Sequence, residues 1–177
     1  MKFKKRGYFF VLDAVLGLFI LVIGVFLISS SYVNIPEPTQ VGFLSDDLLK
    51  YLSGTKIKEL NNPYAGIGGE LWEQGLITEA ENSLLQQIGE FYAKKNIDIS
   101  EKFIENVSKE IMPPQYLYEL WINDVILYPK VPSSQHLKSK DSTEILLTSR
   151  TITFGIINKT TGDIWGPYKV EVFAWQK

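Results

Sequence analysis

The first 28 residues constrain the fold most, because a basic cluster there runs directly into a long apolar segment. Lys2-Phe-Lys-Lys-Arg-Gly7 precedes Tyr8–Ile28, in which Asp13 is the only charged residue. A helix of this length would extend roughly 30 Å, the thickness of the hydrocarbon core of a bilayer. The sequence therefore predicts a transmembrane helix over residues 8–28. An acid in such a helix costs about 2.5–3.5 kcal/mol on insertion scales, so Asp13 needs a specific reason.

The charges that flank the apolar segment predict its orientation. Four of the first six residues are Lys or Arg, whereas residues 29–49 contain neither. Basic residues favour the cytoplasmic side, which predicts a cytoplasmic N-terminus and an extracellular part over residues 29–177. Three kinds of segment begin in this way: a secretory signal cleaved near Ser29–Ser31, an uncleaved signal anchor, and a leader from which only the basic part is removed.

The residues at the border favour the third kind. Lys4-Lys5-Arg6-Gly7 followed by an apolar run from Tyr8 resembles the class III signal peptide of archaeal type IV pilin-like proteins. In that family a prepilin-type peptidase cuts after the glycine, and the apolar helix stays with the mature subunit in the filament core. The resemblance implies cleavage between Gly7 and Tyr8, with Lys4, Lys5 and Arg6 recognised as the leader.

Asp13 is the residue that the resemblance explains best. It would be the sixth residue of the cleaved chain, whereas bacterial major pilins usually place a glutamate at the fifth, beside the N-terminal ammonium of a neighbouring subunit. A buried acid requires such a partner. Ala14, Gly17 and Gly24 would let neighbouring helices approach closely during assembly.

Composition limits what the rest of the chain does. Removal of Met1–Gly7 deletes four basic residues and no acid, which changes the net charge from −2 to −6. A mildly acidic chain with no basic run beyond the leader argues against a nucleic-acid groove. The absence of cysteine excludes disulfides, zinc–thiolate sites and thiol catalysis. Two sequons, at Asn106 and Asn158, are candidate glycosylation sites.

The exported part divides into a helical and a strand-rich half. After a leader (1–7), the helix (8–28) and a proline-containing linker (29–44), we expect an α+β domain over 45–177, helical over 45–112 and sheet over 116–177. Thr78-Glu-Ala-Glu81 predicts a capping box for a helix over 82–95. Ser100 predicts the cap of a second helix, over 101–112.

Strand periodicity begins at Tyr116. Residues 116–122 and 125–128 flank Asn123-Asp124, which predicts a two-residue hairpin turn. Two further strands are expected over 150–157 and 165–175. The predicted fold class is therefore α+β and pilin-like: a long N-terminal transmembrane helix, a helical middle and an antiparallel sheet of about four strands.

No catalytic constellation is evident. His136, the only histidine, falls in a polar stretch over 129–142 that predicts a mobile loop, so we expect it to be solvated. Acid pairs such as Glu79/Glu81 are sufficiently explained by helix starts. We therefore expect no enzyme, no cofactor and no metal site.

The leading hypothesis is a minor pilin or pseudopilin of an archaeal type IV pilus-like surface filament. Its partners would be the membrane, the peptidase, other pilin-like subunits and the assembly machinery. The alternative is an uncleaved, membrane-anchored extracytoplasmic binding or accessory module. A secreted enzyme is the third possibility, and it lacks a catalytic constellation.

Overall fold

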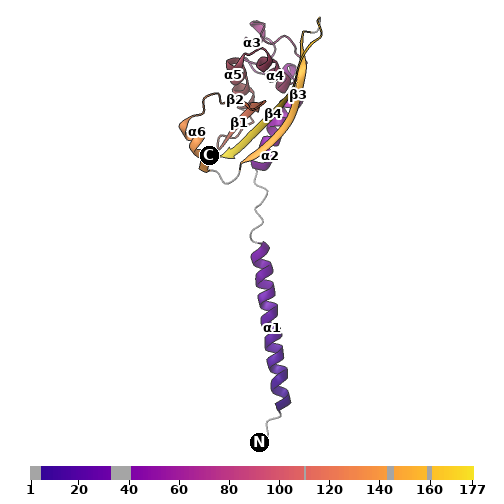
Figure 1. The fold of residues 1–177 in the computed structure, drawn as a ribbon, viewed down its shortest axis with the longest axis vertical. Helices are drawn as coiled ribbons and strands as arrows, with labels where there is room; N and C mark the ends of the chain where they lie inside the picture. The colour runs from indigo at the N-terminus through magenta and orange to yellow at the C-terminus, as the bar shows by residue number, and fades with distance from the viewer. Residues whose placement is uncertain (1–4, 33–40, 110, 143–145, 159–160) are drawn as a thin grey trace. The chain divides into compact units, whose positions relative to one another are not determined.

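The computed structural model describes residues 5–32, 41–109, 111–142, 146–158 and 161–177. These residues form two compact units, residues 1–38 and 39–177 (Figure 1). The elements in chain order are α1 (Lys5–Tyr32), α2 (Val41–Gly54), η1 (Ile57–Glu59), α3 (Glu70–Glu73), α4 (Leu84–Ala93), α5 (Ile97–Ser108), β1 (Tyr116–Ile122), β2 (Val125–Tyr128), α6 (Ser134–Ser142), β3 (Leu147–Asn158) and β4 (Asp163–Gln176).

The first unit contains a single described helix, α1, of 28 residues. It begins at Lys5, three residues before the start that the sequence predicted. Crossing a bilayer takes about 20 consecutive, mostly apolar residues in one helix. Among the residues that the structure describes, no helix is long and apolar enough for this. The transmembrane helix in the predicted fold class is therefore wrong.

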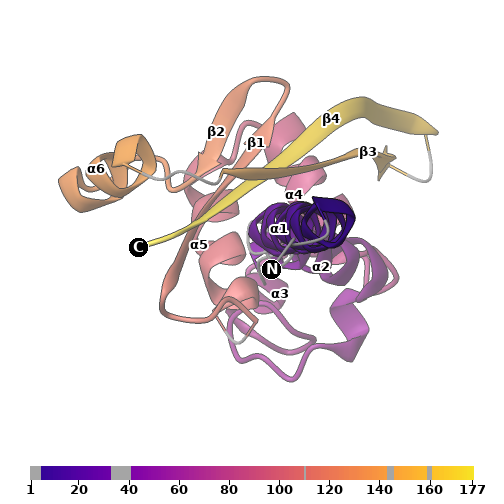
Figure 2. The same ribbon diagram turned by 90° about the horizontal axis from the view of Figure 1, so that it is seen from below.

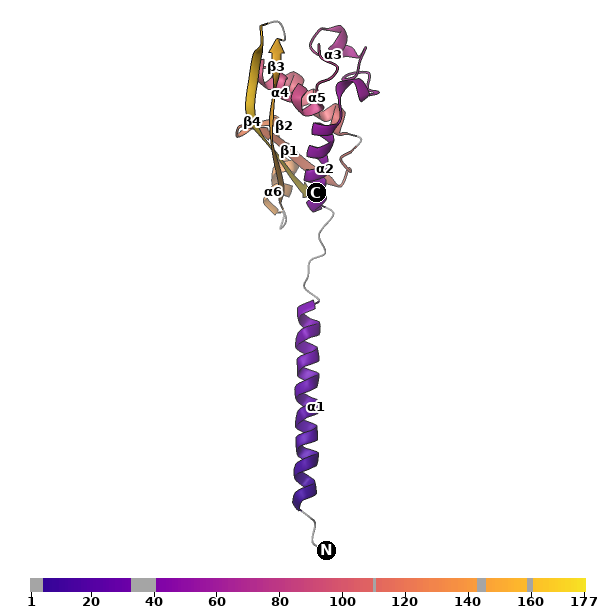
Figure 3. The same cartoon turned by 90° about the vertical axis from the view of Figure 1, so that its right-hand side faces the viewer.

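The second unit is an α+β domain with a four-stranded antiparallel sheet in the order β2-β1-β4-β3. Helices α2, α4 and α5 pack against one face of this sheet (Figure 3). Their apolar stripes, including Leu48, Ile88 and Phe103, are fully buried. We call this side of the sheet the inner face. On β4, Val170, Val172 and Ala174 point to this face and are inaccessible to solvent.

The β1–β2 hairpin confirms the sequence prediction in detail. Both strands have the predicted bounds, and the turn residues Asn123 and Asp124 have φ angles of 47° and 66°. Two consecutive positive φ angles define the type I′ turn, whose twist matches that of a hairpin. β3 and β4 also form, and each is longer than predicted.

The predicted helix caps are wrong. The helix expected over 82–95 begins at Leu84, and its capping box pairs Ser83 with Gln86 rather than Thr78 with Glu81. Ser100 does not cap a helix: α5 starts earlier, at Ile97, and Ser100 is buried inside it. Polar residues near a helix start offer several alternative caps, and tertiary packing selects among them.

The polar stretch before β3 is also ordered differently from the prediction. Residues 134–142 form helix α6, which lies beside the C-terminal end of β4 (Figures 1 and 2). Of its residues only His136 is buried. The expected mobile loop over 129–142 is therefore wrong for its second half. The proline-containing part of the linker, residues 33–40, lies outside the described residues.

Candidate interaction sites

Helix α1 exposes apolar side chains on every side. Of its residues, those from Val11 to Phe26 have described side chains. All twelve large apolar residues in that range are between 44% and 72% exposed. A surface helix of a globular protein has one apolar stripe, whereas a helix that is apolar all round is buried in its working environment. The surface of α1 is therefore of the kind that packs against other apolar surfaces.

The predicted assembly residues form part of this surface. Asp13, Gly17 and Gly24 are separated by four and seven residues, which places them on one face of α1. A Cβ atom added to Gly17 or Gly24 would meet nothing within 4 Å. Nothing else in the described chain therefore requires glycine at these positions, while close helix approach would. Ala14 is exposed beside this face.

The predicted cleavage site lies within the first turns of α1. Gly7 and Tyr8 both have helical backbone, and Lys4 lies outside the described residues. A peptidase requires an extended backbone around the scissile bond, so this end of the helix must unwind for cleavage. Glycine lowers that cost, because it is about 1 kcal/mol less favourable than alanine inside a helix.

The second unit presents an apolar surface at the far end of the β3–β4 hairpin. Ile152, Phe154, Ile156 and Ile164 are each at least half exposed, up to 74% for Ile164. β3 is also an edge strand, because it pairs only with β4 in the described sheet. Contiguous exposed apolar residues beside an edge strand are typical of interaction sites. We call these four residues the hairpin patch.

A buried tryptophan supports the hairpin patch from the inner face. Trp165 is 4% exposed and stacks on Tyr168, with 5.5 Å between the ring centroids. A Cβ atom at Gly89 of α4 would lie 2.2 Å from the Trp165 ring, and one at Gly155 of β3 would lie 2.7 Å from it. Both glycines therefore provide the space that this indole occupies. The sequence analysis missed them, since Gly89 is remote in the chain from the hairpin and the pairing of Gly155 with Trp165 is set by the strand register.

A groove of about 1110 Å³ is lined by the β3–β4 hairpin, including Phe154, Ile156 and Ile164, and by the segment that precedes α4. The opposite wall consists of Thr78, Glu79, Glu81 and Asn82, and Glu90 contributes a third acid. That acid is already paired: Lys94 Nζ lies 2.5 Å from one carboxylate oxygen, and Asn82 Nδ2 donates to the other at 3.1 Å. The carboxylate of Glu90 is therefore already neutralised within the domain.

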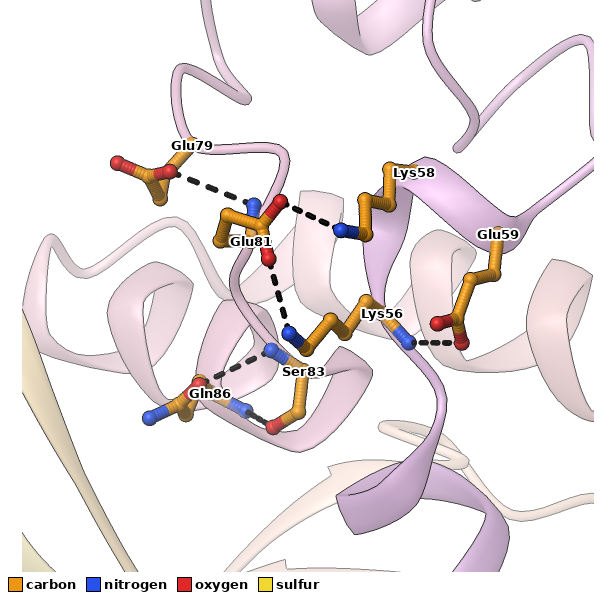
Figure 4. Close-up of polar contacts among 7 residues, drawn as sticks. All are labelled: Lys56, Lys58, Glu59, Glu79, Glu81, Ser83 and Gln86. Atoms are coloured by element: carbon orange, nitrogen blue, oxygen red, sulfur yellow. Dashed lines mark hydrogen bonds and ion pairs between the residues drawn. The ribbon is translucent and has the colours of Figure 1, made fainter.

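The opposite wall is fixed by backbone pairing and by a surface ion network (Figure 4). Ile57 N donates to Asn82 O at 3.0 Å, and Leu84 N donates to Thr55 O at 3.0 Å. Glu81 accepts from Lys56 Nζ at 2.8 Å and from Lys58 Nζ at 2.7 Å. These two bonds lower the pKa of Glu81 to about 2.

A third cluster lies on the outer face, the side of the sheet away from α2, α4 and α5. The carboxylate of Glu119 on β1 is 1% exposed and accepts from Lys140 Nζ at 2.6 Å and from Trp121 Nε1 at 2.9 Å. Its second oxygen lies 3.3 Å from His136 Nε2. The prediction that His136 is solvated is therefore wrong. Burial lowers the pKa of its imidazole, although Glu119 acts in the opposite direction.

Lys140 is enclosed by aromatic rings as well as by this carboxylate. Its Nζ lies 5.6 Å from the ring centroids of Trp121 and Phe173 and 5.7 Å from that of Trp175. We call Glu119 and these three rings the ammonium cage. Cation–π attraction acts within about 6 Å of a ring centroid, so each ring contributes. The sequence analysis did not find this site, because its parts come from β1, β4 and α6.

The sequons differ in what the structure shows of them. Asn106 lies on α5, and its Nδ2 donates to Lys102 O at 2.8 Å. The hydroxyl-bearing residue of the same sequon, Ser108, is buried and hydrogen-bonded to the Tyr118 hydroxyl. This geometry does not present the Asn106 sequon as an exposed loop. The side chain of Asn158 lies outside the described residues.

The described residues contain no group of three or more His, Asp or Glu side chains placed to hold a metal ion. In the Glu119 cluster, the carboxylate is engaged by Lys140 and Trp121 at once, which leaves it no free role as a general base. No known family model matches this chain, and neither does any curated protein or solved structure.

Proposed function

We propose that this protein is a structural subunit of a surface filament, a minor pilin or pseudopilin of the archaeal type IV pilus-like kind. The observation that carries the proposal is the exposed apolar surface all round α1, over Val11–Phe26. Like helices packed side by side in a filament core would bury this surface. Burial of apolar area contributes about 25 cal/mol per Å², which makes such a helix a strong driver of assembly.

The Asp13 face of α1 supports the same function. Gly17 and Gly24 allow another helix to approach the face on which Asp13 lies. In the packed core Asp13 requires a cationic partner, because an isolated buried carboxylate is strongly destabilising. Cleavage after Gly7 would create that partner, the α-ammonium group of Tyr8 in a neighbouring subunit. Processing and assembly are thereby linked through one ion pair.

The second unit supports a subunit role in a different way. It has its own core, built from α2, α4, α5 and the sheet, and so folds without requiring α1. The hairpin patch remains exposed on it. A filament subunit has to contact its neighbours outside the helical core, and this patch is the apolar surface suited to that contact.

The first experiment is intact mass measurement with N-terminal sequencing, applied to protein from the cell envelope and from sheared surface filaments. A chain that begins at Tyr8 in the filament fraction is the expected result. Replacement of Gly7 by valine should block cleavage and leave the chain beginning at Met1. A wild-type chain that begins at Met1 in every fraction would contradict processing and assembly alike.

The role of Asp13 requires its own variant. Asp13→Ala should still be processed, since the scissile bond is unchanged, but its amount in sheared filaments should fall at least tenfold. Asp13→Glu retains the charge and should recover part of the incorporation. Equal incorporation of wild type and Asp13→Ala would remove the proposed pairing with the Tyr8 ammonium.

A further inference from the structure

We propose that the ammonium cage on the outer face is a binding site for an organic ammonium group, with Lys140 as a built-in occupant that the ligand displaces. The ligand class is an alkylated amine or the side chain of a lysine from another chain. The inference concerns residues 119–175 alone. It is independent of α1 and of the filament function proposed above.

The first argument is the completeness of the cage. Three aromatic rings lie 5.6–5.7 Å from one nitrogen, and a carboxylate that is 1% exposed accepts a hydrogen bond from it at 2.6 Å. Aromatic walls with one buried carboxylate are the chemistry that recognises ammonium ions. Trp175 is inaccessible to solvent, and its indole N–H has no hydrogen-bond partner among the described residues. An ammonium group cannot accept a hydrogen bond from this N–H, so Trp175 contributes only its ring to the cage.

The second argument is that the present occupant is weakly held. Lys140 projects from α6, in which His136 is the only buried residue. The remaining contacts between α6 and the sheet are those of His136 with Glu119 and Trp175 and a hydrogen bond from Ser139 Oγ to Gln176 O at 3.1 Å. A helix with so little apolar burial is held by local polar contacts, and elements of this kind open at low free-energy cost. The side chain of Lys140 is itself 28% exposed, so an exit to solvent exists.

The third argument compares Lys140 with its neighbour Lys138. Both belong to α6, yet Lys138 is exposed and lines a shallow surface depression with Ser134 and Gln135. His136 already docks α6 on the sheet, through Glu119 and through an edge-to-face contact with Trp175 at 4.7 Å between the ring centroids. The cage instead encloses the one group that a free ammonium ligand would replace. Lys140 then acts as an intramolecular competitor, whose effective concentration weakens binding of the ligand.

The test uses the full chain in a non-ionic detergent and two probes, tetramethylammonium chloride and Nα-acetyl-lysine amide. Binding is followed by tryptophan fluorescence, because Trp121 and Trp175 line the cage. Sodium chloride at equal concentration controls for ionic strength. Lys140→Ala should lower the apparent dissociation constant for at least one probe about tenfold or more, since the competitor is removed. Lys138→Ala is the matched control and should bind as wild type does.

Hydrogen exchange provides a second measurement. Its result would not change on addition of the probe if the cage had only a structural role. In wild type, saturation with the better probe should speed amide exchange of residues 134–142, because Lys140 leaves the cage and α6 loosens. A preference for tetramethylammonium points to a free alkylated amine, and a preference for the lysine probe points to a protein partner. Equal responses to the probes and to sodium chloride in Lys140→Ala would overturn the proposal. So would a gain in Lys138→Ala equal to that in Lys140→Ala.

Discussion

The two faces of the sheet are held by different interactions. On the inner face, residues such as Val172 and Leu120 pack without solvent access against helices α2, α4 and α5. On the outer face, α6 covers one end through Glu119 and Lys140, and the hairpin patch stays bare at the other end. The inner face is stabilised by buried apolar area and close packing, which are spread over many residues. The outer face depends on a few specific polar contacts, such as that of Glu119 with Lys140. It is therefore the face on which a ligand can most easily replace a side chain of the protein.

The largest difference in stability between the two faces is expected at Phe103. Its ring is fully buried and meets Phe91 edge to face, with 5.6 Å between the centroids. Phe103→Ala should lower the free energy of unfolding by about 3–5 kcal/mol, because the lost free energy of burying the ring and the cost of the cavity that it leaves add together. Phe154→Ala, on the bare part of the outer face at 67% exposure, should change it by less than about 0.5 kcal/mol. Denaturant unfolding of both variants measures the contrast, and similar losses would refute the division between faces.

Gly89 tests how tightly the inner face is packed. An exposed helical Gly→Ala change is usually stabilising by about 1 kcal/mol. At Gly89 the new methyl group would lie 2.2 Å from the Trp165 ring, so Gly89→Ala should instead destabilise by about 1–3 kcal/mol. Gly54→Ala, also on a helix but with open space around its Cβ position, is the matched control and should not destabilise. A stabilised Gly89→Ala would show that Trp165 moves freely.

These two faces also differ in how much of them the sequence predicted. The inner face follows from local patterns: the helical spacing of Leu84, Ile88 and Phe91, and the alternation of Val170 and Val172, are visible without a structure. The hairpin turn at Asn123-Asp124 was predicted with the correct strand bounds, because its chemistry is contained in adjacent residues.

The outer face could not be predicted in this way. The α6 segment, Ser134–Ser142, has no apolar periodicity, and its folding depends on Glu119 and Trp175, which are remote in sequence. A polar stretch with a lone histidine has the composition of a solvated loop until its partner carboxylate is known. Trp165 and Gly89 illustrate the same limit on the inner face, since only tertiary structure brings them together.

On the outer face, His136 should make the stability of the fold depend on pH. Burial, opposed by Glu119, keeps the pKa of its imidazole below the ordinary value of 6.5. The unfolded chain therefore binds a proton more readily than the folded chain. Stability is fully present above pH 6.5 and declines as the pH falls below it, towards the folded pKa. The decline should stay modest, because one pKa unit corresponds to about 1.4 kcal/mol. His136→Gln should flatten this slope in denaturant unfolding between pH 7 and pH 5, about the range in which histidine titrates. An unchanged slope would assign the effect to other groups.

The smallest effect is expected at the surface network of Lys56, Lys58 and Glu81 (Figure 4). Hydrogen bonds from the two lysines lower the pKa of Glu81 from 4.5 to about 2. A carboxyl with a lowered pKa stabilises the fold above pH 4.5, and that contribution is lost as the pH falls from 4.5 towards 2.

Lys56→Gln should raise the Glu81 pKa towards its ordinary value while hardly changing stability at pH 7, because exposed ion pairs are well screened by solvent. Carboxyl titration by NMR measures the shift, with Lys138→Gln on α6 as the control that leaves Glu81 unchanged. Salt at about 1 M, where the Debye length is about 3 Å, should reduce the difference between wild type and Lys56→Gln. If stability at pH 7 instead fell as far as in Gly89→Ala, the wall of the groove would depend on charge pairs as the outer face does. The boundary between regions stabilised by apolar packing and regions stabilised by ion pairs would then lie at the groove, and not between the two faces of the sheet.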